Sequence, residues 1–235
     1  MSQPIALRIA LPKGRLQDPV LQLFAAAGYD VPDRDDLRTR KLVFDRGNVE
    51  WIFVKDGDVP VYVEHGAADV GVAGLDQILE HESTAYQPVE MPFGRCRMMV
   101  IGAPDAPPLS ADVTSKIATK YPRIARHYLE SRGLRGEIVP LSGSVELAAV
   151  LHLTSHVIDL VETGETVRVH NLVIQDVVAE ISPRLIVGKN VYRTEPKTIR
   201  DLIARVAAAV VRHHAGLPSP EEVEAAATSA PQKRN

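Results

Sequence analysis

An apolar segment that ends in acidic and hydroxyl side chains is the part of this sequence best suited to chemistry. Val157–Val161 is apolar apart from Asp159, and Glu162 and the turn Thr163–Thr166 follow it. Parallel α/β sheets bind ligands beyond the carboxyl ends of their strands. Consecutive backbone N–H groups and threonine hydroxyls in such a turn can hold a phosphate group without a lysine. The segment therefore predicts a strand and a phosphate-binding turn, in which Gly164 lets the backbone approach the ligand closely.

The two acids beside this turn are also candidates for ligand binding. The carboxylates of Asp159 and Glu162 could accept hydrogen bonds from sugar hydroxyls or hold a magnesium ion. The simpler alternative is a strand that ends in a solvated turn, because a Thr-Gly-x-Thr motif is too short to decide by itself. The Asp-Leu-Val-Glu sequence directly before the turn favours ligand binding.

Four basic residues, Lys13, Arg15, Arg40 and Lys55, stand at or near expected strand ends and turns. A reaction that expels pyrophosphate needs fixed positive charge where negative charge accumulates. Arginine can clamp phosphate oxygens with two hydrogen bonds, whereas lysine acts as a point charge. For any one of the four alone, a solvated surface charge is the simpler interpretation. Lys13 and Arg15 are the exception, because they flank Gly14 directly after an apolar strand.

Glu146 is a weaker candidate. It follows Gly143-Ser144-Val145 at an expected helix start, where the helix dipole stabilises a carboxylate. Helix capping explains it as well as ligand binding does. We predict no metal site made by protein side chains.

The elements that must position these residues alternate between strand and helix patterns. Strand-like segments are Ile5–Leu11, Lys41–Phe44, Val49–Val54, Asp69–Ala73, Arg97–Gly102, Lys116–Thr119, Glu137–Leu141 and Val157–Val161, with further elements at Leu172–Ala179 and Arg184–Val187. Helices are expected at Val20–Ala27, Asp58–His65, Leu75–His81, Tyr121–Ser131, Ser142–Val150 and Thr198–His213. This alternation predicts an α/β architecture with mainly parallel strands and helices on both faces.

Two such series along the chain predict two lobes, with the active site in the cleft between them. We expect residues 1–93 and 178–215 to form the first lobe and residues 94–177 the second. From Gly216 onward, Pro, Glu, Ala and Ser replace any hydrophobic periodicity, which predicts a disordered tail over residues 216–235.

Composition restricts the class of protein. The 235 residues are 45% hydrophobic and 24% charged, as in an ordinary soluble globular protein. A net charge of −3 gives no electrostatic reason to expect a nucleic-acid partner. No signal peptide and no apolar run of membrane-spanning length is recognised, and a single cysteine suits a reducing compartment, so we expect a cytoplasmic protein without a membrane partner.

The segment Asp159–Thr166 resembles the phosphoribosyl-pyrophosphate loop of the ATP phosphoribosyltransferases. Other blocks resemble the same family in the same order: Ala10–Leu16, Arg40–Leu42, Asp58–Glu64, Gly66–Gly71, Gly94–Arg97, Ala118–Pro122 and Gly143–Ala148. The resemblance extends to about Ala208, and so many independent blocks argue against coincidence. The chain departs from the family pattern at Lys55, where arginine is usual, and at Glu165, where asparagine is usual.

This resemblance implies a reaction. N1 of the adenine of ATP attacks the anomeric carbon of phosphoribosyl pyrophosphate, and pyrophosphate leaves with its charge neutralised by Mg²⁺, as the first step of histidine biosynthesis. The residues implied to be catalytic are Arg15, Arg40 and Lys55. The residues implied to bind substrate are Lys13, Glu146, Asp159, Glu162, Thr163, Gly164, Glu165 and Thr166.

The resemblance also implies a fold and a partner. The family fold is a two-lobed α/β unit like the type II periplasmic solute-binding proteins. Only a short polar tail follows the last expected helix, so the chain resembles the short form of the family. That form is a homodimer when alone, and joins a regulatory subunit similar to a histidyl-tRNA synthetase in a hetero-octamer. The alternatives are a non-catalytic solute-binding module and a phosphoribosyltransferase for a salvage base.

Overall fold

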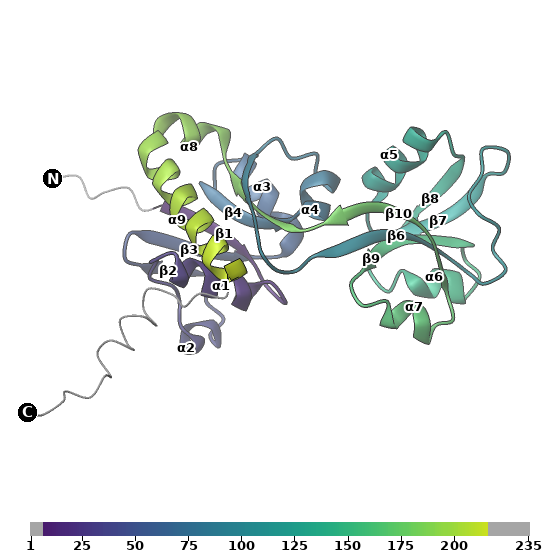
Figure 1. Cartoon of the computed structure of the whole chain (residues 1–235), viewed down its shortest axis with the longest axis horizontal. Coiled ribbons are helices and arrows are strands. Elements are labelled where there is room, and N and C mark those ends of the chain that lie inside the picture. Colours follow the sequence, from purple (N-terminus) through teal and green to yellow (C-terminus); the bar gives the residue numbers. More distant parts are fainter. Residues whose placement is uncertain (1–6, 216–235) are drawn as a thin grey trace, which may run out of the picture. The chain divides into compact units, whose positions relative to one another are not determined.

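Two mixed sheets organise residues 7–215, the part of the chain that this computed structural model describes (Figure 1). The tail expected at 216–235 lies outside the described residues. Within the described residues, the first compact unit contains residues 7–74, Ser83–Gly94 and residues 183–215. The second contains Leu75–Glu82 and Arg95–Ser182.

The first unit is built on a six-stranded sheet whose central strand is the first strand of the chain. β1 (Leu7–Pro12) runs parallel to β3 (Val49–Val54) and to β4 (Val70–Gly74). The remaining strands are antiparallel to their neighbours and complete the order β2-β3-β1-β4-β11-β5: β2 (Val43–Arg46), β11 (Pro183–Val187) and β5 (Tyr86–Glu90).

Helices cover both faces of this sheet because alternate strand residues point to opposite sides. Val70 and Val72 of β4 belong to a core that also contains side chains of α1 (Gln17–Ala26) and α9 (Pro196–Ala215). Gly71 faces the other side, where α3 (Val59–Glu64) approaches so closely that a Cβ would lie 2.6 Å from Val59 Cγ1. Three short elements complete the unit: α2 (Arg34–Leu37), the 3₁₀ turn η1 (Asp56–Asp58) and α8 (Lys189–Thr194).

The second unit contains a five-stranded sheet with the order β10-β6-β9-β7-β8. Its strands are β6 (Cys96–Gly102), β7 (Ser115–Thr119), β8 (Gly136–Pro140), β9 (His156–Val161) and β10 (Val173–Ile181). β7 is parallel to β8 and β9, so these three strands end at the same edge. β6 is antiparallel to both of its neighbours, β9 and β10.

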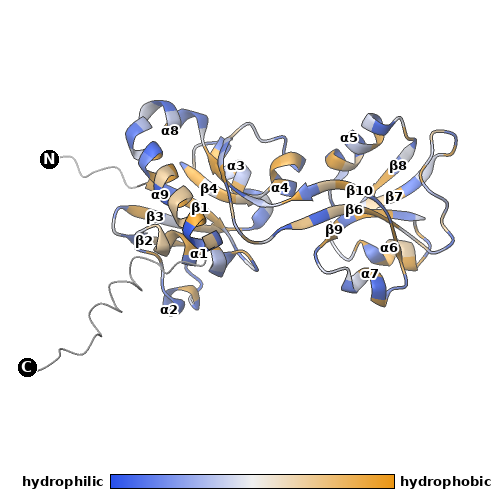
Figure 2. Ribbon diagram, viewed as in Figure 1, coloured by the Kyte–Doolittle hydropathy of each residue, from blue (hydrophilic) through white to orange (hydrophobic). Residues whose placement is uncertain are grey.

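Alternating side chains of β6 divide the core of the second unit into two layers. Met98 and Val100 pack with residues of α5 (Pro122–Arg132), whereas Met99 and Ile101 pack with residues of α6 (Glu146–Val150) and α7 (Glu165–Val169). Figure 2 shows hydrophobic residues in the strands of both sheets. Both faces of the sheet are therefore covered by helices.

The short helix α4 (Leu75–Glu80) lies between two segments of the first unit in sequence but packs on α5 of the second. The Glu80 carboxylate accepts hydrogen bonds from the backbone N–H groups of Arg123 and Ile124, each at 3.1 Å. In return, the Arg123 guanidinium donates to the backbone carbonyl of Glu80 at 3.0 Å. The side chains of Glu80 and Arg123 thus supply hydrogen-bond partners for backbone groups at the amino end of α5 and the carboxyl end of α4.

The boundaries of the two compact units differ from the expected lobe boundaries at three places. Residues 75–82 and 178–182 were expected in the first lobe and belong to the second unit, because α4 packs on α5 and β10 pairs with β6 as far as Ile181. Gly94 was expected in the second lobe and belongs to the first unit.

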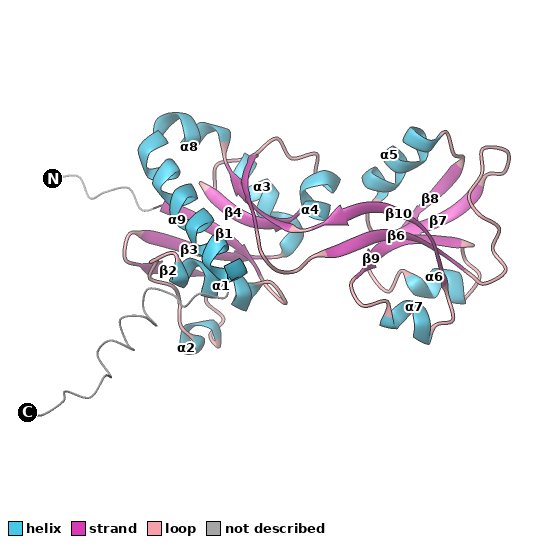
Figure 3. Cartoon of the chain, in the orientation of Figure 1, coloured by secondary structure: helices cyan, strands magenta, loops and turns pink. Residues whose placement is uncertain are grey.

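Most expected strands and helices are present within a few residues of their expected bounds (Figure 3). The expectation of mainly parallel strands was wrong, because the hairpin β2–β3 and the returning strands β6, β10 and β11 make both sheets mixed. β5 was missed because it is a polar edge strand that contains Pro88, and prolines in sheets are confined to such edges. α6 begins at Glu146 and not at Ser142, because Ser144 has a positive φ of 47°.

Within residues 7–215, no helix is long and apolar enough to cross a membrane.

Candidate active site

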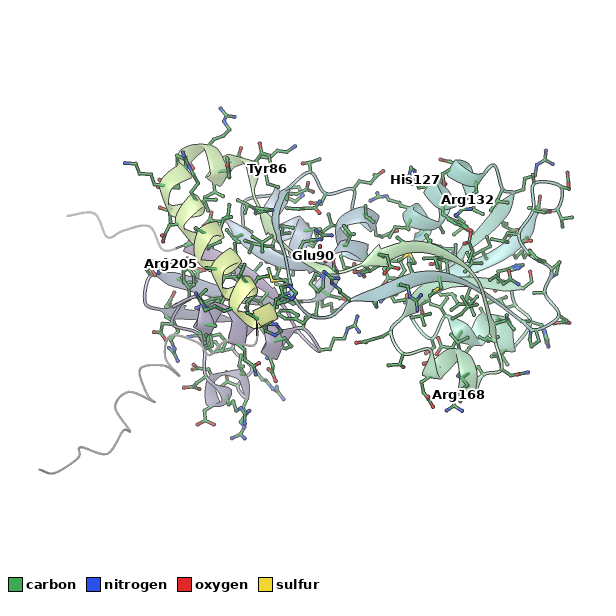
Figure 4. The ribbon with its side chains drawn as sticks, viewed as in Figure 1. Tyr86, Glu90, His127, Arg132, Arg168 and Arg205 are labelled. Carbon is green, nitrogen blue, oxygen red and sulfur yellow. The ribbon has the colours of Figure 1, made fainter. Side chains whose placement is uncertain are left out.

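The expected phosphate-binding turn connects β9 to α7 in the second unit. Gly164 stands directly before α7 with a φ of 76°, a left-handed conformation that glycine adopts without strain. The backbone N–H of Glu165 lies 3.4 Å from the Thr163 hydroxyl oxygen, and the Thr163 and Thr166 side chains are exposed. The Glu165 carboxylate lies 2.6 Å from the guanidinium of Arg168, which Figure 4 labels. This ion pair offsets the negative charge that Glu165 adds to the turn.

The turn shares its edge of the sheet with two other loops. Thr119 pairs with Ile158 of β9 and with Pro140 of β8. The chain that follows each of the three strands therefore emerges at the same carboxyl edge, which is where α/β sheets bind ligands. The segments brought together there are Lys120–Tyr121, Leu141–Glu146 and Glu162–Thr166. Two predicted site residues that are far apart in sequence, Glu146 and Glu162, thus belong to one edge.

Asp159 directly follows Ile158, the last residue of β9 that pairs with β7, and it is partly buried. Burial raises the pKa of the Asp159 carboxyl above its usual range, because it disfavours the charged form. The Leu160 backbone N–H, which donates to Oδ1 at 2.8 Å, and the Lys120 ammonium lower this pKa, whereas the carboxylates of Glu146 and Asp76 raise it. Charged groups from three other segments therefore act on Asp159.

Sequence reasoning missed two residues of this group, Asp76 and Lys120. Asp76 of α4 is buried, and its Oδ2 accepts hydrogen bonds from the Tyr121 hydroxyl at 3.0 Å and from Gln77 Nε2 at 2.8 Å. No local pattern marks Asp76, because its partner is 45 residues away. A signal did exist for Lys120: it follows an apolar strand directly, as Lys13 does.

The predicted basic residues gather at the corresponding carboxyl edge of the first sheet. The backbone N–H of Lys13 donates to the Val54 carbonyl at 2.9 Å, so Lys13 and Lys55 emerge side by side after β1 and β3. The loop before β2 reaches the same edge, because the Phe53 N–H donates to the Leu42 carbonyl at 2.8 Å. The side chains of Lys13, Arg15, Arg40 and Lys55 are all exposed there. We call these four residues the basic edge.

The turn that carries Arg15 has its own local cause. Gly14 has a φ of 99°, and its carbonyl accepts the N–H of Gln17 at 3.0 Å, at the start of α1. Two acidic residues, Asp56 and Asp58, follow Lys55 in η1. The structure thus brings the predicted residues together as two groups, one in each unit. A single cleft that contains both groups stays a prediction.

A cavity of about 790 Å³ lies elsewhere in the first unit, between α3, α8 and the first turn of α9. It is lined by the ion pair of Arg8 and Asp69, whose charged atoms lie 3.0 Å apart, and by no residue of the predicted site. These residues stand at the amino ends of β1 and β4, the opposite edge from Lys13. Position and lining therefore separate this cavity from the basic edge. Among the described residues, no three His, Cys, Asp or Glu side chains gather to hold a metal ion.

Comparisons with known proteins agree on one family. The family model described as "HisG: ATP phosphoribosyltransferase" matches residues 55–208. An ATP phosphoribosyltransferase of Sorangium cellulosum is 40% identical over 211 residues, which cover 89% of this chain and 97% of that protein. A second, from Teredinibacter turnerae, is 41% identical over 207 residues, covering 87% and 96%.

Solved structures support both the fold and the family. The ATP phosphoribosyl transferase (HisG:HisZ) complex from Thermotoga maritima matches with a TM-score of 0.77 and 30% identity, over 88% of this chain and 99% of that chain. The aliphatic sulphonate binding protein SsuA of Escherichia coli, at 14% identity and a TM-score of 0.54, shows the fold alone. The expected two-lobed, periplasmic-binding-protein-like fold is confirmed. This chain belongs to the ATP phosphoribosyltransferase family, the enzymes that catalyse the first step of histidine biosynthesis.

Proposed function

We propose that the two units divide the binding of phosphoribosyl pyrophosphate between them. The second unit binds the phosphoribosyl part, with its 5′-phosphate in the turn Thr163–Thr166 and its ribose hydroxyls on Asp159 and Glu162. The basic edge of the first unit binds the pyrophosphate and the phosphates of ATP. The observation that carries this proposal is the left-handed Gly164 turn at the shared carboxyl edge of β7, β8 and β9.

Charge placement explains how this arrangement accelerates the transfer. Adenine N1 forms a bond to the anomeric carbon while the bond from that carbon to the pyrophosphate oxygen breaks, and pyrophosphate leaves with the electron pair. The ribose becomes cation-like as this happens, so positioning and electrostatic stabilisation carry most of the catalysis. Arg15, Arg40 and Lys55 offset the negative charge that grows on the leaving group. Adenine N1 is already unprotonated at neutral pH, so the proposal needs no general base.

Magnesium enters this proposal with the substrate. Mg²⁺ prefers oxygen ligands and is often held by substrate phosphates together with few protein groups. We infer that the ion arrives bound to the pyrophosphate. Bound there, Mg²⁺ lowers the charge that the basic edge must offset. Asp159 and Glu162 are accordingly assigned to the ribose hydroxyls.

A regulatory partner is the second part of the proposal. The Thermotoga match is to a HisG:HisZ complex. We infer that this chain, as a short-form enzyme, also joins a HisZ-like subunit that resembles a histidyl-tRNA synthetase, in a hetero-octamer, and forms a homodimer when alone. The match over 99% of the Thermotoga chain supports this inference.

Two fragments of the substrate test the division between the units. Ribose 5-phosphate carries only the groups assigned to the second unit, and magnesium pyrophosphate only those assigned to the first. We expect the double variant Thr163→Ala, Thr166→Ala to lose affinity for ribose 5-phosphate in calorimetry and to keep its affinity for pyrophosphate. The double variant Lys13→Ala, Lys55→Ala should show the reverse. Unchanged ribose 5-phosphate binding in the threonine variant would refute the assignment of the turn.

An absorbance assay with phosphoribosyl pyrophosphate separates the activity from its alternatives. We expect product with ATP and none with free adenine, guanine or uracil. A salvage enzyme would show the opposite preference, and a solute-binding module would bind without turnover.

A further inference from the structure

The second unit exposes a group of large apolar side chains on one side of its sheet. We call this group the outer apolar face; its residues are Leu147, Val150, Leu151, Val169, Ile174 and Val177. Leu151 is 72% exposed and Val169 64%, and the other four are between 37% and 44% exposed. Single exposed apolar residues are common on protein surfaces, whereas a group of them marks an interaction surface.

The helix α6 is apolar on both of its sides. Ala148 and Ala149 are buried in the core of the second unit. Leu147, Val150 and Leu151 follow the i, i+3, i+4 spacing of the opposite side of the helix and point away from the sheet. A helix that is apolar all round is normally buried on all sides. In the described part of the chain, however, this outward side of α6 remains exposed.

The helix α7 has the same two-sided pattern. Val167 is buried in the same core, whereas Val169, two positions further along the helix, points away from it. Between them stands Arg168, whose guanidinium lies 2.6 Å from the Glu165 carboxylate (Figure 4). These are the two charged residues of α7, and they neutralise each other. The outward side of α7 therefore carries no net charge.

The edge strand β10 extends the outer apolar face beyond the two helices. Ile174 pairs with Ile101 and Val177 pairs with Met99. Residues that pair in an antiparallel sheet point to the same side of it. Met99 and Ile101 pack with residues of α6 and α7, so Ile174 and Val177 lie on the side of the sheet that these helices cover. Exposed apolar side chains from three elements thus share one side of the second unit.

The sequence around this face carries no formal charge over two runs. Residues 147–158 and 169–175 contain no Asp, Glu, Lys or Arg. In a two-fold symmetric contact, residues near the axis meet their own copies, so a charged residue there would meet a like charge. An uncharged apolar face avoids that repulsion, whereas an acidic or basic partner would find no opposite charge on it. The charge pattern therefore favours a second copy of this chain.

We propose that the outer apolar face is the two-fold contact of the homodimer, in which α6 and α7 of one copy pack against the same helices of the other. This inference rests on the proposed function, which gives the isolated chain a homodimer. A permanent dimer keeps the apolar side chains out of water whether or not the regulatory subunit is bound.

The contact is made by side chains and not by joining two sheets. The pairing of β10 with β6 is irregular at two places, between Ile174 and Asp176 and between Val177 and Ala179. Such irregularities bend and twist an edge strand, which makes it unsuited to pair with a strand of another copy.

Exposed valines elsewhere provide matched controls. Val211 of α9, in the first unit, is 66% exposed. Val113 is 61% exposed and belongs to the loop before β7, in which Leu109 packs with the core residues of α5 on the other side of the sheet. Val113→Asp and Val211→Asp add the same charge as Val169→Asp, at similar exposure but away from the outer apolar face.

Sedimentation of the full-length chain measures the outcome. We expect a dimeric wild type, and in the double variant Leu151→Asp, Val169→Asp a dimer dissociation constant raised by on the order of a hundredfold or more, because symmetry places each substitution in the contact twice. The double variant Leu151→Gln, Val169→Gln should shift the constant in the same direction by less. Val113→Asp and Val211→Asp should sediment like the wild type. Circular dichroism shows which variants are folded, and the glutamine variant decides the question if the aspartate variant is not.

Each other outcome counts against the inference. A wild-type dimer that persists in the folded double variants overturns it, and so does equal dissociation in the two control variants. If the double variants stay dimeric but no longer bind the partner subunit, the face belongs to that subunit, and the inference is again wrong. A monomeric wild type instead refutes the homodimer of the proposed function, and the inference with it.

Discussion

In the proposed function, single residues decide whether the carboxyl edge of β7, β8 and β9 can hold a phosphate, and Gly164 is the clearest case. Its φ of 76° belongs to a region that β-branched residues almost never adopt. The nearest atom to a Cβ placed there would be Val161 Cγ1 at 4.0 Å, so the space is open and the backbone conformation is the constraint. A substitution therefore acts on the direction of the N–H groups in the turn.

We predict that Gly164→Val abolishes detectable turnover and leaves the fold intact by circular dichroism. The matched control is Gly133→Val at the end of α5, where φ is 63° and no atom lies within 4 Å of the added Cβ. Both variants should lose about 1–2 kcal/mol of stability through left-handed strain. Only Gly164→Val should lose affinity for phosphoribosyl pyrophosphate in calorimetry, and wild-type affinity in that variant would contradict the assignment.

The basic edge supports a second prediction about single residues, which concerns kcat. If Arg15 and Arg40 stabilise pyrophosphate mainly in the transition state, alanine at either should lower kcat by roughly two to three orders of magnitude. Lys55→Arg should be tolerated, because arginine offers two hydrogen bonds to a phosphate where lysine offers a point charge. Steady-state kinetics check both expectations.

Arg38→Ala is the control for Arg40→Ala. Arg38 stands two positions earlier, is 79% exposed and is paired with Asp35 at 3.1 Å, so its loss should leave kcat unchanged. A rise in KM alone for Arg15→Ala and Arg40→Ala would mean that each arginine binds the ground state as strongly as the transition state. The transition-state role would then be wrong.

At the scale of elements, the contact between α4 and α5 holds Tyr121 in place at the carboxyl edge of β7. Tyr121, which precedes α5, makes no side-chain cap, and Glu80 of α4 accepts the first free N–H groups instead. The same helix carries Asp76, which fixes the Tyr121 hydroxyl. Helix capping is thus supplied by a segment 43 residues away.

We predict that Glu80→Ala lowers the free energy of unfolding by about 1 kcal/mol, the usual cost of losing a helix cap. Glu82→Ala is the control, because its pair with Arg123, at 3.7 Å, joins side chains that are 74% and 52% exposed. Such exposed pairs contribute little. Urea denaturation of the two variants checks the difference, and equal stabilities would show that Glu80 does not act as a cap.

At the scale of the whole molecule, the question is where the regulation assigned to the partner subunit in the proposed function takes place. The described residues 7–215 are used by the two units, and among them there is no third unit for an effector. Allostery needs a second site and two states that the effector binds differently. In the proposed function, that site belongs to the HisZ-like partner.

Histidine, the end product of the pathway, is the expected effector. We predict that the isolated chain shows no inhibition by histidine at physiological concentrations and becomes sensitive when the partner subunit is added. Calorimetry of histidine with the purified chain checks the first half, and activity assays of the reconstituted complex check the second. Binding of histidine to the isolated chain at micromolar affinity would place the effector site within these residues. The cavity beside Arg8 and Asp69 would then be the first place to look.

The sequence by itself determined the local features of this protein. Apolar strands such as Val157–Val161, the glycine turn after it and the expected elements near their true bounds follow from periodicity and from the chemistry of neighbouring residues. The resemblance of the Asp159–Thr166 segment to the family loop also lies within one short stretch. Such signals are local, so the sequence contains all of their causes.

Only the tertiary structure decided which distant residues meet. Asp76, Lys120 and Glu146 act on Asp159 because the parallel strands β7 and β9 end together and because α4 packs on α5. The mixed pairing of both sheets and the place of residues 75–82 in the second unit depend on the same long-range contacts. The longest-range of these contacts join residues far apart in sequence, such as Tyr121 and Asp76, which are 45 residues apart. No periodicity within either segment specifies its partner, because the pairing arises from shape and burial in the folded chain.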